Sequence, residues 1–289
     1  MRSEDPSRPA MITCALSGVM ANRSQCAAIP YTPEEYAAEA RRAFEAGAAA
    51  VHIHARTPEG APSFEVVDYQ NIRDAIVAEC PVIINFSTGA LGVSVEKRVE
   101  YLHAVKPAVA ALNMGSMNYA KYSEKKRDFV FDFVFTNPIA EIRALLAAMV
   151  AADIRPECEC FDLGHVGTLA PLIAMGALPA PFQVSLILGV IGGIPGTVAN
   201  LVHAVSQLPE GADWEVIALS TDQWRLLAAG ASVGGNVRVG LEDNFYLEPG
   251  VMARSNGDLV AKAARMLRDI GRPIADVETC RARLGLVHR

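Results

Sequence analysis

The chain has 289 residues, of which 51% are hydrophobic and 20% charged, so it can bury one large core and is too apolar to be disordered. Its formal net charge of −6 comes without a block of like charges, which argues against a nucleic-acid-binding surface or a polybasic membrane patch. The six cysteines are scattered, mostly within apolar runs. We therefore expect buried, reduced thiols in a cytoplasmic protein that acts on small molecules.

Neither the N-terminal segment nor the longest apolar stretch has the composition of a targeting or membrane-spanning segment. Residues 1–10 are polar and mixed in charge, which predicts a loose arm rather than a signal or transit peptide. The longest apolar stretch, 184–194, contains three glycines and ends at Pro195, well short of the ~20 residues that a membrane span needs. We expect no membrane association.

Short runs rich in Val, Ile, Leu and Cys alternate with alanine-rich stretches of helical period, as in a parallel sheet with crossover helices. The clearest helix follows Thr32, where an N-cap precedes a proline and two acids, and it ends near Gly47. The predicted strands cover residues 12–17, 50–55, 82–87, 109–114, 158–163, 182–188, 215–220 and 237–243. The other predicted helices cover residues 66–79, 95–105, 138–152, 169–175, 197–207, 223–232 and 255–271, with a tail helix at 277–284.

Eight strands in a chain slightly longer than about 250 residues predict a (β/α)8 barrel. We expect one domain over residues 1–289, with a short N-terminal arm and a C-terminal tail helix. A doubly wound sheet with an extra subdomain is the alternative. In a barrel, the functional residues lie at the carboxyl ends of the strands, and these ends are polar in this sequence.

The end of the second predicted strand carries two histidines. Strand alternation in the run Val-His-Ile-His places His52 and His54 on one face and the two apolar residues on the other. Two imidazoles at this spacing suit zinc, copper, iron or nickel. A metal-chelating pair is the prediction, and a purely structural pair is the alternative.

A third metal ligand is predicted at the end of the eighth strand. Alternation there puts Arg238, Gly240 and Glu242 on the inward face. In a closed barrel the second and eighth strands both flank the first, so Glu242 can reach the ion held by His52 and His54 and leave one coordination position open. Such a site favours catalytic zinc. A surface cluster of acids is the alternative.

Charged residues around the predicted metal suggest an acid–base machinery. Asp243 follows Glu242 directly, within reach of a metal-bound molecule, and is the predicted general base. Arg238 points inward and needs a buried partner, for which Glu159 on the fifth strand has the right parity. We expect this pair to orient Asp243. The alternatives are an N-cap role for Asp243 and a purely structural ion pair.

Three loops offer weaker signals for substrate binding. Ser87, Thr88 and Gly89 end the third strand with hydroxyls and flexible amides, a suitable nest for a substrate carboxylate. Ser116 offers a hydroxyl after the fourth strand, although short polar residues are common in turns. The glycine-rich loop 189–197 precedes a helix and could admit a phosphate to its backbone amides.

Seven segments of the chain carry a family resemblance: ITCALSG, TPEEYAAEARRAFEAGAAAVHIHAR, NFSTGA, LNMGSMN, PECECFDLGH, LGVIGGIPGT and VRVGLEDNFYLEPG. Together they resemble the β-keto acid cleavage enzyme family, and they span nearly the whole chain. The resemblance implies a zinc-dependent (β/α)8 barrel that exchanges a β-keto acid with acetyl-CoA, giving acetoacetate and a new acyl-CoA. It also implies a homo-tetramer, for which the apolar tail 284–287 could supply a contact.

The resemblance also implies roles for individual residues. It implies that His52, His54 and Glu242 bind the metal. Asp243 is the implied base, supported by Arg238 and Glu159. Ser87 and Thr88 are the residues implied to bind the substrate carboxylate. One position departs from family members that take an amino-bearing substrate, which have an acid after the first strand where this chain has Met20. Since an ammonium group would be desolvated there without a counter-charge, we expect an uncharged, apolar β-keto acid.

Two other functional classes remain open from the sequence. An amidohydrolase-like metal enzyme also uses a His-x-His pair at a barrel strand end, but needs further ligands, and the sixth strand offers Gln183 and Ser185 instead of histidine. A noncatalytic barrel that only binds small molecules is the third possibility.

Overall fold

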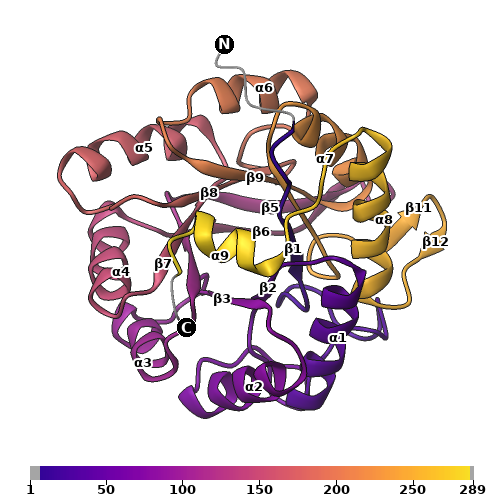
Figure 1. Cartoon of the computed structure of the whole chain (residues 1–289), viewed down its shortest axis with the longest axis horizontal. Coiled ribbons are helices and arrows are strands. Elements are labelled where there is room, and N and C mark those ends of the chain that lie inside the picture. Colours follow the sequence, from indigo (N-terminus) through magenta and orange to yellow (C-terminus); the bar gives the residue numbers. More distant parts are fainter. Residues whose placement is uncertain (1–6, 287–289) are drawn as a thin grey trace.

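The computed structural model describes residues 7–286. Its parallel strands close into a barrel in the order β1-β10-β9-β8-β7-β4-β3-β2, and helices surround the barrel (Figure 1). The closed sheet confirms the predicted (β/α)8 barrel and excludes the doubly wound alternative. The barrel strands are β1 (Ile12–Ala15), β2 (Ala50–Ile53), β3 (Ile83–Ser87), β4 (Val109–Asn113), β7 (Arg155–Cys160), β8 (Gln183–Leu188), β9 (Asp213–Ala218) and β10 (Asn236–Val239).

The helices follow the predicted segments, with one early start. The outer helices are α1 (Pro33–Ala46), α2 (Val66–Glu79), α3 (Val95–Val105), α4 (Ile139–Ala151), α5 (Leu163–Ala174), α6 (Val198–Ser206), α7 (Gln223–Ser232) and α8 (Asn256–Asp269), with a 3-10 turn η1 (Ser220–Asp222) before α7. Thr32 and Glu35 cap α1 reciprocally, and Gly47 ends it in the left-handed region. Helix α5 begins six residues before its predicted start because Asp162 caps it through the Gly164 amide.

One continuous apolar core lies between the barrel and its helices. All six cysteines are buried and unpaired, as predicted. Among residues 7–286, no helix is long and apolar enough to cross a membrane.

The amino end of the barrel is closed by the chain's own termini. Helix α9 (Val277–Arg283) lies across this end (Figure 1), and its apolar side packs against Met11, Ile83 and Val109. Leu284 and Leu286 are buried in the same cluster, so the prediction that this tail supplies a subunit contact is wrong for these two residues; residue 287 lies outside the described part. The predicted loose arm is also partly wrong, since Ala10 is buried and bridges to Ile274, while residues 1–6 lie outside the description.

The barrel interior is unusually polar. Glu157 on β7 and Glu215 on β9 are fully buried, and the Ser185 hydroxyl of β8 is hydrogen-bonded to both carboxyl groups. Thr13 donates to the Glu215 carboxyl at 2.8 Å, and Asn85 donates to Glu157. Burial, with the neighbouring Glu157 carboxyl adding to it, raises the pKa of Glu215 well above its usual range. Two adjacent buried carboxyl groups therefore lie beneath the barrel mouth.

Two small antiparallel hairpins were not predicted. The larger joins β5 (Met117–Ser123) to β6 (Asp128–Phe135) after β4 and lies at the carboxyl end of the barrel, opposite α9 (Figure 1). The smaller joins β11 (Tyr246–Glu248) to β12 (Val251–Met252). The alternating aromatic residues of 129–135 carry a period-two strand signal that was not used.

Candidate active site

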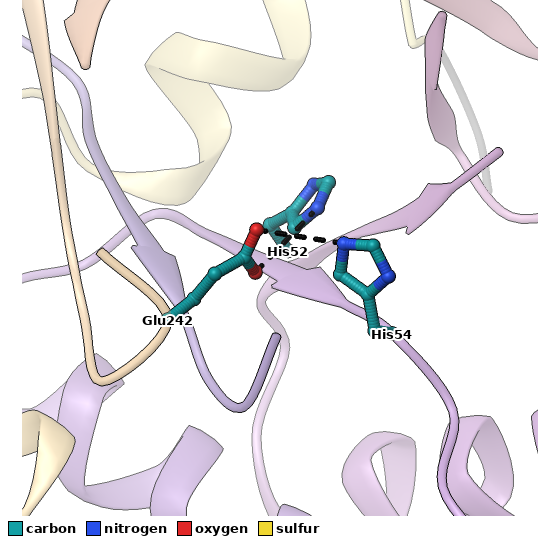
Figure 2. A group of neighbouring side chains, drawn as sticks. All are labelled: His52, His54 and Glu242. Atoms are coloured by element: carbon teal, nitrogen blue, oxygen red, sulfur yellow. Dashed lines mark ion pairs between the residues drawn. The ribbon is translucent and has the colours of Figure 1, made fainter. Parts of the chain in front are cut away.

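The two histidines and the glutamate predicted as metal ligands converge at the carboxyl end of the barrel. Figure 2 shows His52 and His54, from one strand end, facing the Glu242 carboxylate. The Nε2 atom of His52 lies 3.8 Å from Oε2 of Glu242, and that of His54 lies 3.4 Å from Oε1. One ligand atom from each residue falls within 4.8 Å of the others. The spacing is small enough for all three residues to hold one ion.

Strand β1 brings these residues together, as the barrel argument predicted. It pairs with β2 on one side and β10 on the other, and Ala15 lies opposite His52 in the register. The amide of Glu242 donates to the Ala15 carbonyl at 3.2 Å. One residue of β1 thus fixes the backbone on both sides of the site.

The reason given for the direction of Glu242 was wrong in part. Strand β10 ends at Val239, so alternation accounts for Arg238 but not for Glu242. Gly240 has a φ of +142°, and its carbonyl accepts from the amides of Asp243 and Asn244. A tight turn, rather than an extended strand, carries Glu242 over the barrel mouth.

Two residues without a predicted role fix the loop after β1, which packs against Glu242. Gly18 has a φ of +53°, and a Cβ at this position would lie 2.6 Å from Cγ of Glu242. The loop after β1 is fixed by buried Arg56, which donates to the carbonyls of Ser17, Gly18 and Ala21. The spacing His-x-His-x-Arg, which puts Arg56 two residues beyond the second histidine, was the available signal.

The donor groups suit a divalent cation. Both ring nitrogens of His52 and Oε2 of Glu242 are buried and have no hydrogen-bond partner among the described residues. Burial and the neighbouring Arg238 hold the pKa of His52 well below its usual range, so its imidazole is neutral. Arg238 holds the pKa of Glu242 well below its usual range, against the opposing effect of burial. Neutral imidazole nitrogen and ionised carboxylate are the forms in which these side chains bind metals.

Arg238 is the centre of a buried charge network. Its guanidinium contacts both oxygens of Asp243, at 3.0 and 3.1 Å, and Oε1 of Glu242 at 2.8 Å. It also lies 3.4 Å from Oε1 of Glu159, so the predicted pair is present. The bidentate contact fixes the plane of the Asp243 carboxylate, and three carboxylates keep Arg238 charged.

The two other acids in this network have raised pKa values. Burial raises the pKa of Asp243 to about 6, although Arg238 opposes the shift. Burial and the nearby Glu157 raise the pKa of Glu159 to about 8, again against Arg238. Asp243 is therefore the stronger acid of the two and the one in bidentate contact with the arginine.

The predicted carboxylate nest lies at the end of β3. Ser87 is buried, and its Oγ accepts from the Gly89 amide at 3.1 Å. The hydroxyl and the amide of Thr88 both donate to the Ala111 carbonyl, at 2.6 and 3.2 Å. Thr88 thus ties β3 to β4, and its contact with a substrate stays a prediction, as does that of Ser87.

Two other residues predicted to bind the substrate, Ser116 and Met20, lie in loops at the barrel mouth. Ser116 Oγ accepts from the amide of Asn137 at 2.7 Å and so joins the two ends of the β5–β6 hairpin. Met20 is 53% exposed in the loop after β1. The roles of both residues toward a substrate stay predictions.

An aromatic cluster from the unpredicted hairpin forms another part of the site. The Phe135 ring would contact a Cβ on Gly89 at 3.7 Å, so it lies against the carboxylate nest. Tyr119 lies 6.0 Å from Phe135 and 6.3 Å from Phe161, which follows β7 (ring centroids). Burial and the carboxylates of Glu242, Asp243 and Glu159 raise the pKa of Tyr119 to about 12. The hairpin therefore covers the barrel mouth beside the charged network.

The fold and the site define a (β/α)8 barrel with a candidate metal site at its mouth, and sequence comparison specifies its family. The model of the beta-keto acid cleavage enzyme family matches residues 9–286, and the chain belongs to this family. It is 34% identical to a 3-keto-5-aminohexanoate cleavage enzyme from Acetoanaerobium sticklandii, over 96% of this chain and 98% of that protein.

Two further comparisons extend the relationship. The chain is 33% identical to a 3,5-dioxohexanoate:acetyl-CoA acetone transferase from Paraburkholderia graminis, over 96% of each protein. The solved structure of apo ObcA superposes with a TM-score of 0.74 at 20% identity, covering 89% of this chain and 65% of that one. At this identity the ObcA structure shows a shared fold.

Proposed function

We propose that the protein is a zinc-dependent enzyme that condenses a β-keto acid with acetyl-CoA and releases acetoacetate and a new acyl-CoA. The observation that carries the proposal is the convergence of His52, His54 and Glu242 beside an aspartate held in a bidentate contact by Arg238. Family membership supports the β-keto acid, and the acetyl-CoA-dependent activity for which the Paraburkholderia relative is named supports acetyl-CoA.

His52, His54 and Glu242 would hold the zinc ion, which supplies a Lewis acid for a keto oxygen when bound. Asp243 removes the proton from the carbon between the ketone and the carboxylate of the substrate. Arg238 fixes the Asp243 carboxylate in one orientation, so that its free lone pairs face the barrel mouth. Ser87 binds the substrate carboxylate through its hydroxyl.

The proposed reaction balances with one proton shuttled by Asp243. The carbanion attacks the thioester carbonyl of acetyl-CoA and releases CoA thiolate. The thiolate then adds to the original ketone carbonyl, and the bond from this carbon to the carboxylate-bearing carbon breaks. The acyl group leaves as acyl-CoA, and the acetoacetate carbanion recovers the proton from Asp243.

The proposed substrate carries an uncharged, apolar side chain. The loop after β1 presents Met20 where amino-substrate enzymes of the family carry an acid, and Arg56 fixes this loop through three carbonyls. The aromatic rings on the other side of the mouth are also apolar. A homo-tetrameric assembly and a cytoplasmic location stay predictions that light scattering and cell fractionation can check.

The hydrolase alternative has little support from the described residues. His165 is used inside the protein, because its Nδ1 accepts from the Phe161 amide at 3.2 Å. Ser185 donates to buried carboxyl groups, so β8 supplies no further metal ligand from this position.

The test is turnover of a panel of alkyl and amino-bearing β-keto acids with acetyl-CoA, measured as acetoacetate formed. We expect alkyl substrates to react faster than 3-keto-5-aminohexanoate. Asp243→Asn should lower kcat by at least ~100-fold, the usual value of a general base. Asp74→Asn, on the exposed side of α2, is the matched control and should leave kcat unchanged. Faster turnover of the amino substrate would refute the role of Met20, and full activity of Asp243→Asn would refute the base.

A further inference from the structure

One face of the β5–β6 hairpin carries a continuous row of aromatic rings. In the register, Met117 pairs with Phe135, Tyr119 with Phe133 and Lys121 with Phe131. Because side chains alternate across a strand pair, these residues share one face. Tyr119 stacks with Phe133 at 5.3 Å, and Phe131 lies 5.9 Å from Phe133 between ring centroids. The three phenylalanines are only half-buried, so the row is open to a ligand.

The row begins at the candidate active site. Its inner end is Phe135, which lies against Gly89, and Tyr119, which contacts Phe161 at the end of β7. A bridge between Ala120 and Ile191 fixes the hairpin to the loop after β8. The row therefore leads outward from the reacting centre along a fixed element.

The turn at the outer end of the hairpin carries a small net positive charge. Lys125, Lys126 and Arg127 are exposed there between the exposed acids Glu124 and Asp128, and none of the three cations forms an ion pair with another described residue. Arg127 is eight residues before Phe135 along the strand, which corresponds to about 26 Å at about 3.3 Å per residue. Three adjacent exposed cations on a chain of net charge −6 favour contact with an anionic group.

The glycine-rich loop 189–197, the other candidate for binding phosphate, is occupied by internal hydrogen bonds. The amides of Gly189, Gly193 and Ile194 donate to the carbonyls of Ile194, Val190 and Phe161, respectively. Gly192, with a φ of +104°, allows Asn118 of the hairpin to pack against the loop, where a Cβ would lie 1.9 Å from the Asn118 carbonyl oxygen. This loop supports the hairpin and has these amides committed.

We infer that the β5–β6 hairpin is the docking surface for the CoA part of acetyl-CoA. The thioester lies at the Phe135 end, the pantetheine chain runs along the rings of Phe133 and Phe131, and the phosphates meet Lys125, Lys126 and Arg127. The order of chemistry along the hairpin, from reacting centre to apolar row to cations, matches the order along the co-substrate. The inference rests on the proposed function, in which acetyl-CoA is a substrate.

The first test is direct binding of free CoA to the purified protein by calorimetry, which does not require turnover. Lys125→Ala/Lys126→Ala should weaken CoA binding about tenfold, the loss expected for two exposed charge pairs. The control Arg265→Ala/Arg268→Ala removes two exposed cations from α8 and should leave binding unchanged. The loss in the hairpin variant should shrink as salt is raised.

A second test separates the row from the turn by shortening the co-substrate. Phe131→Ala should raise KM for both acetyl-CoA and acetyl-pantetheine about tenfold. Lys125→Ala/Lys126→Ala should raise KM for acetyl-CoA alone, because acetyl-pantetheine lacks the nucleotide phosphates.

The two tests fail in different ways. Unchanged CoA binding in the lysine variant would overturn the docking surface while leaving the reaction intact. The same conclusion would follow if the variant differed from the wild type only in its oligomeric mass, measured by light scattering. CoA binding that depends on the lysines without turnover of any β-keto acid would refute the proposed reaction and leave the docking surface standing.

Discussion

One side of the barrel mouth consists mainly of buried charged residues, and the other mainly of aromatic residues. On the side of β1, β2 and β10, buried charges contact one another at hydrogen-bond distance, and glycines at positive φ bring their backbones close. On the side of β4 and β7, half-buried aromatic rings stand on a hairpin outside the barrel. The side chains of the charged side are held by several contacts each, whereas the rings of the aromatic side are partly exposed to solvent.

This difference separates reaction from recognition. A base and metal ligands must be held within fractions of an ångström, so they sit where the closed sheet fixes the backbone on both sides. A long, flexible co-substrate needs area and charge more than exact placement, and a hairpin can supply both. Substitutions on the two sides should therefore differ in kind as well as in size.

The largest expected effect is on the charged side. Arg238→Gln leaves the buried carboxylates of Glu242 and Asp243 without their cation, and we expect a loss of about 3–5 kcal/mol in the free energy of unfolding, together with loss of activity. Chemical denaturation measures the loss. Phe133→Leu on the aromatic side should cost about 1 kcal/mol or less, since the ring is half-exposed. Equal losses for both variants would remove the distinction between the two sides.

An intermediate effect is expected at Gly18. Gly18→Ala places a methyl group against Glu242, at a φ of +53°, and should weaken zinc binding at least about tenfold. Gly92→Ala is the matched control, because Gly92 has a φ of +69° but nothing within 4 Å of its Cβ position. Both should lose about 1 kcal/mol of stability from backbone strain. Zinc affinity that falls equally in both variants would point to general strain rather than to Glu242.

The smallest expected effect lies beneath the mouth, at Glu215. Its pKa is raised in the folded protein, so the folded state retains a proton that the unfolded state releases. The resulting stability is complete below the unfolded pKa of about 4.5 and is lost as pH rises toward the folded pKa. Glu215→Gln should therefore flatten the fall in melting temperature as the pH rises above about 4.5. A wild-type slope in the variant would contradict the assignment.

Much of the barrel could be predicted because its signals are local and periodic. Apolar runs gave the eight strands, and the neighbour relation of the first, second and eighth strands followed from closure alone. That relation was enough to bring His52 and Glu242 together, even though a turn rather than alternation directs Glu242.

Some features of the site were not predicted because they depend on contacts between segments that are distant in the sequence. The need for Gly18 arises from Glu242, which is distant in sequence, and becomes visible only when β1 and β10 are side by side. The aromatic hairpin was missed for another reason. No strand is predicted between residues 114 and 138, although Phe129, Phe131, Phe133 and Phe135 alternate as in a strand.

The central claim is that His52, His54 and Glu242 hold one catalytic zinc ion. The most direct measurement is the metal content of the purified protein by mass spectrometry, compared among the wild type, His52→Ala and Glu242→Ala. We predict zinc near one equivalent in the wild type and its loss in both variants, with His103→Ala, an exposed histidine on α3, retaining it. One equivalent of zinc retained in both His52→Ala and Glu242→Ala would contradict the account.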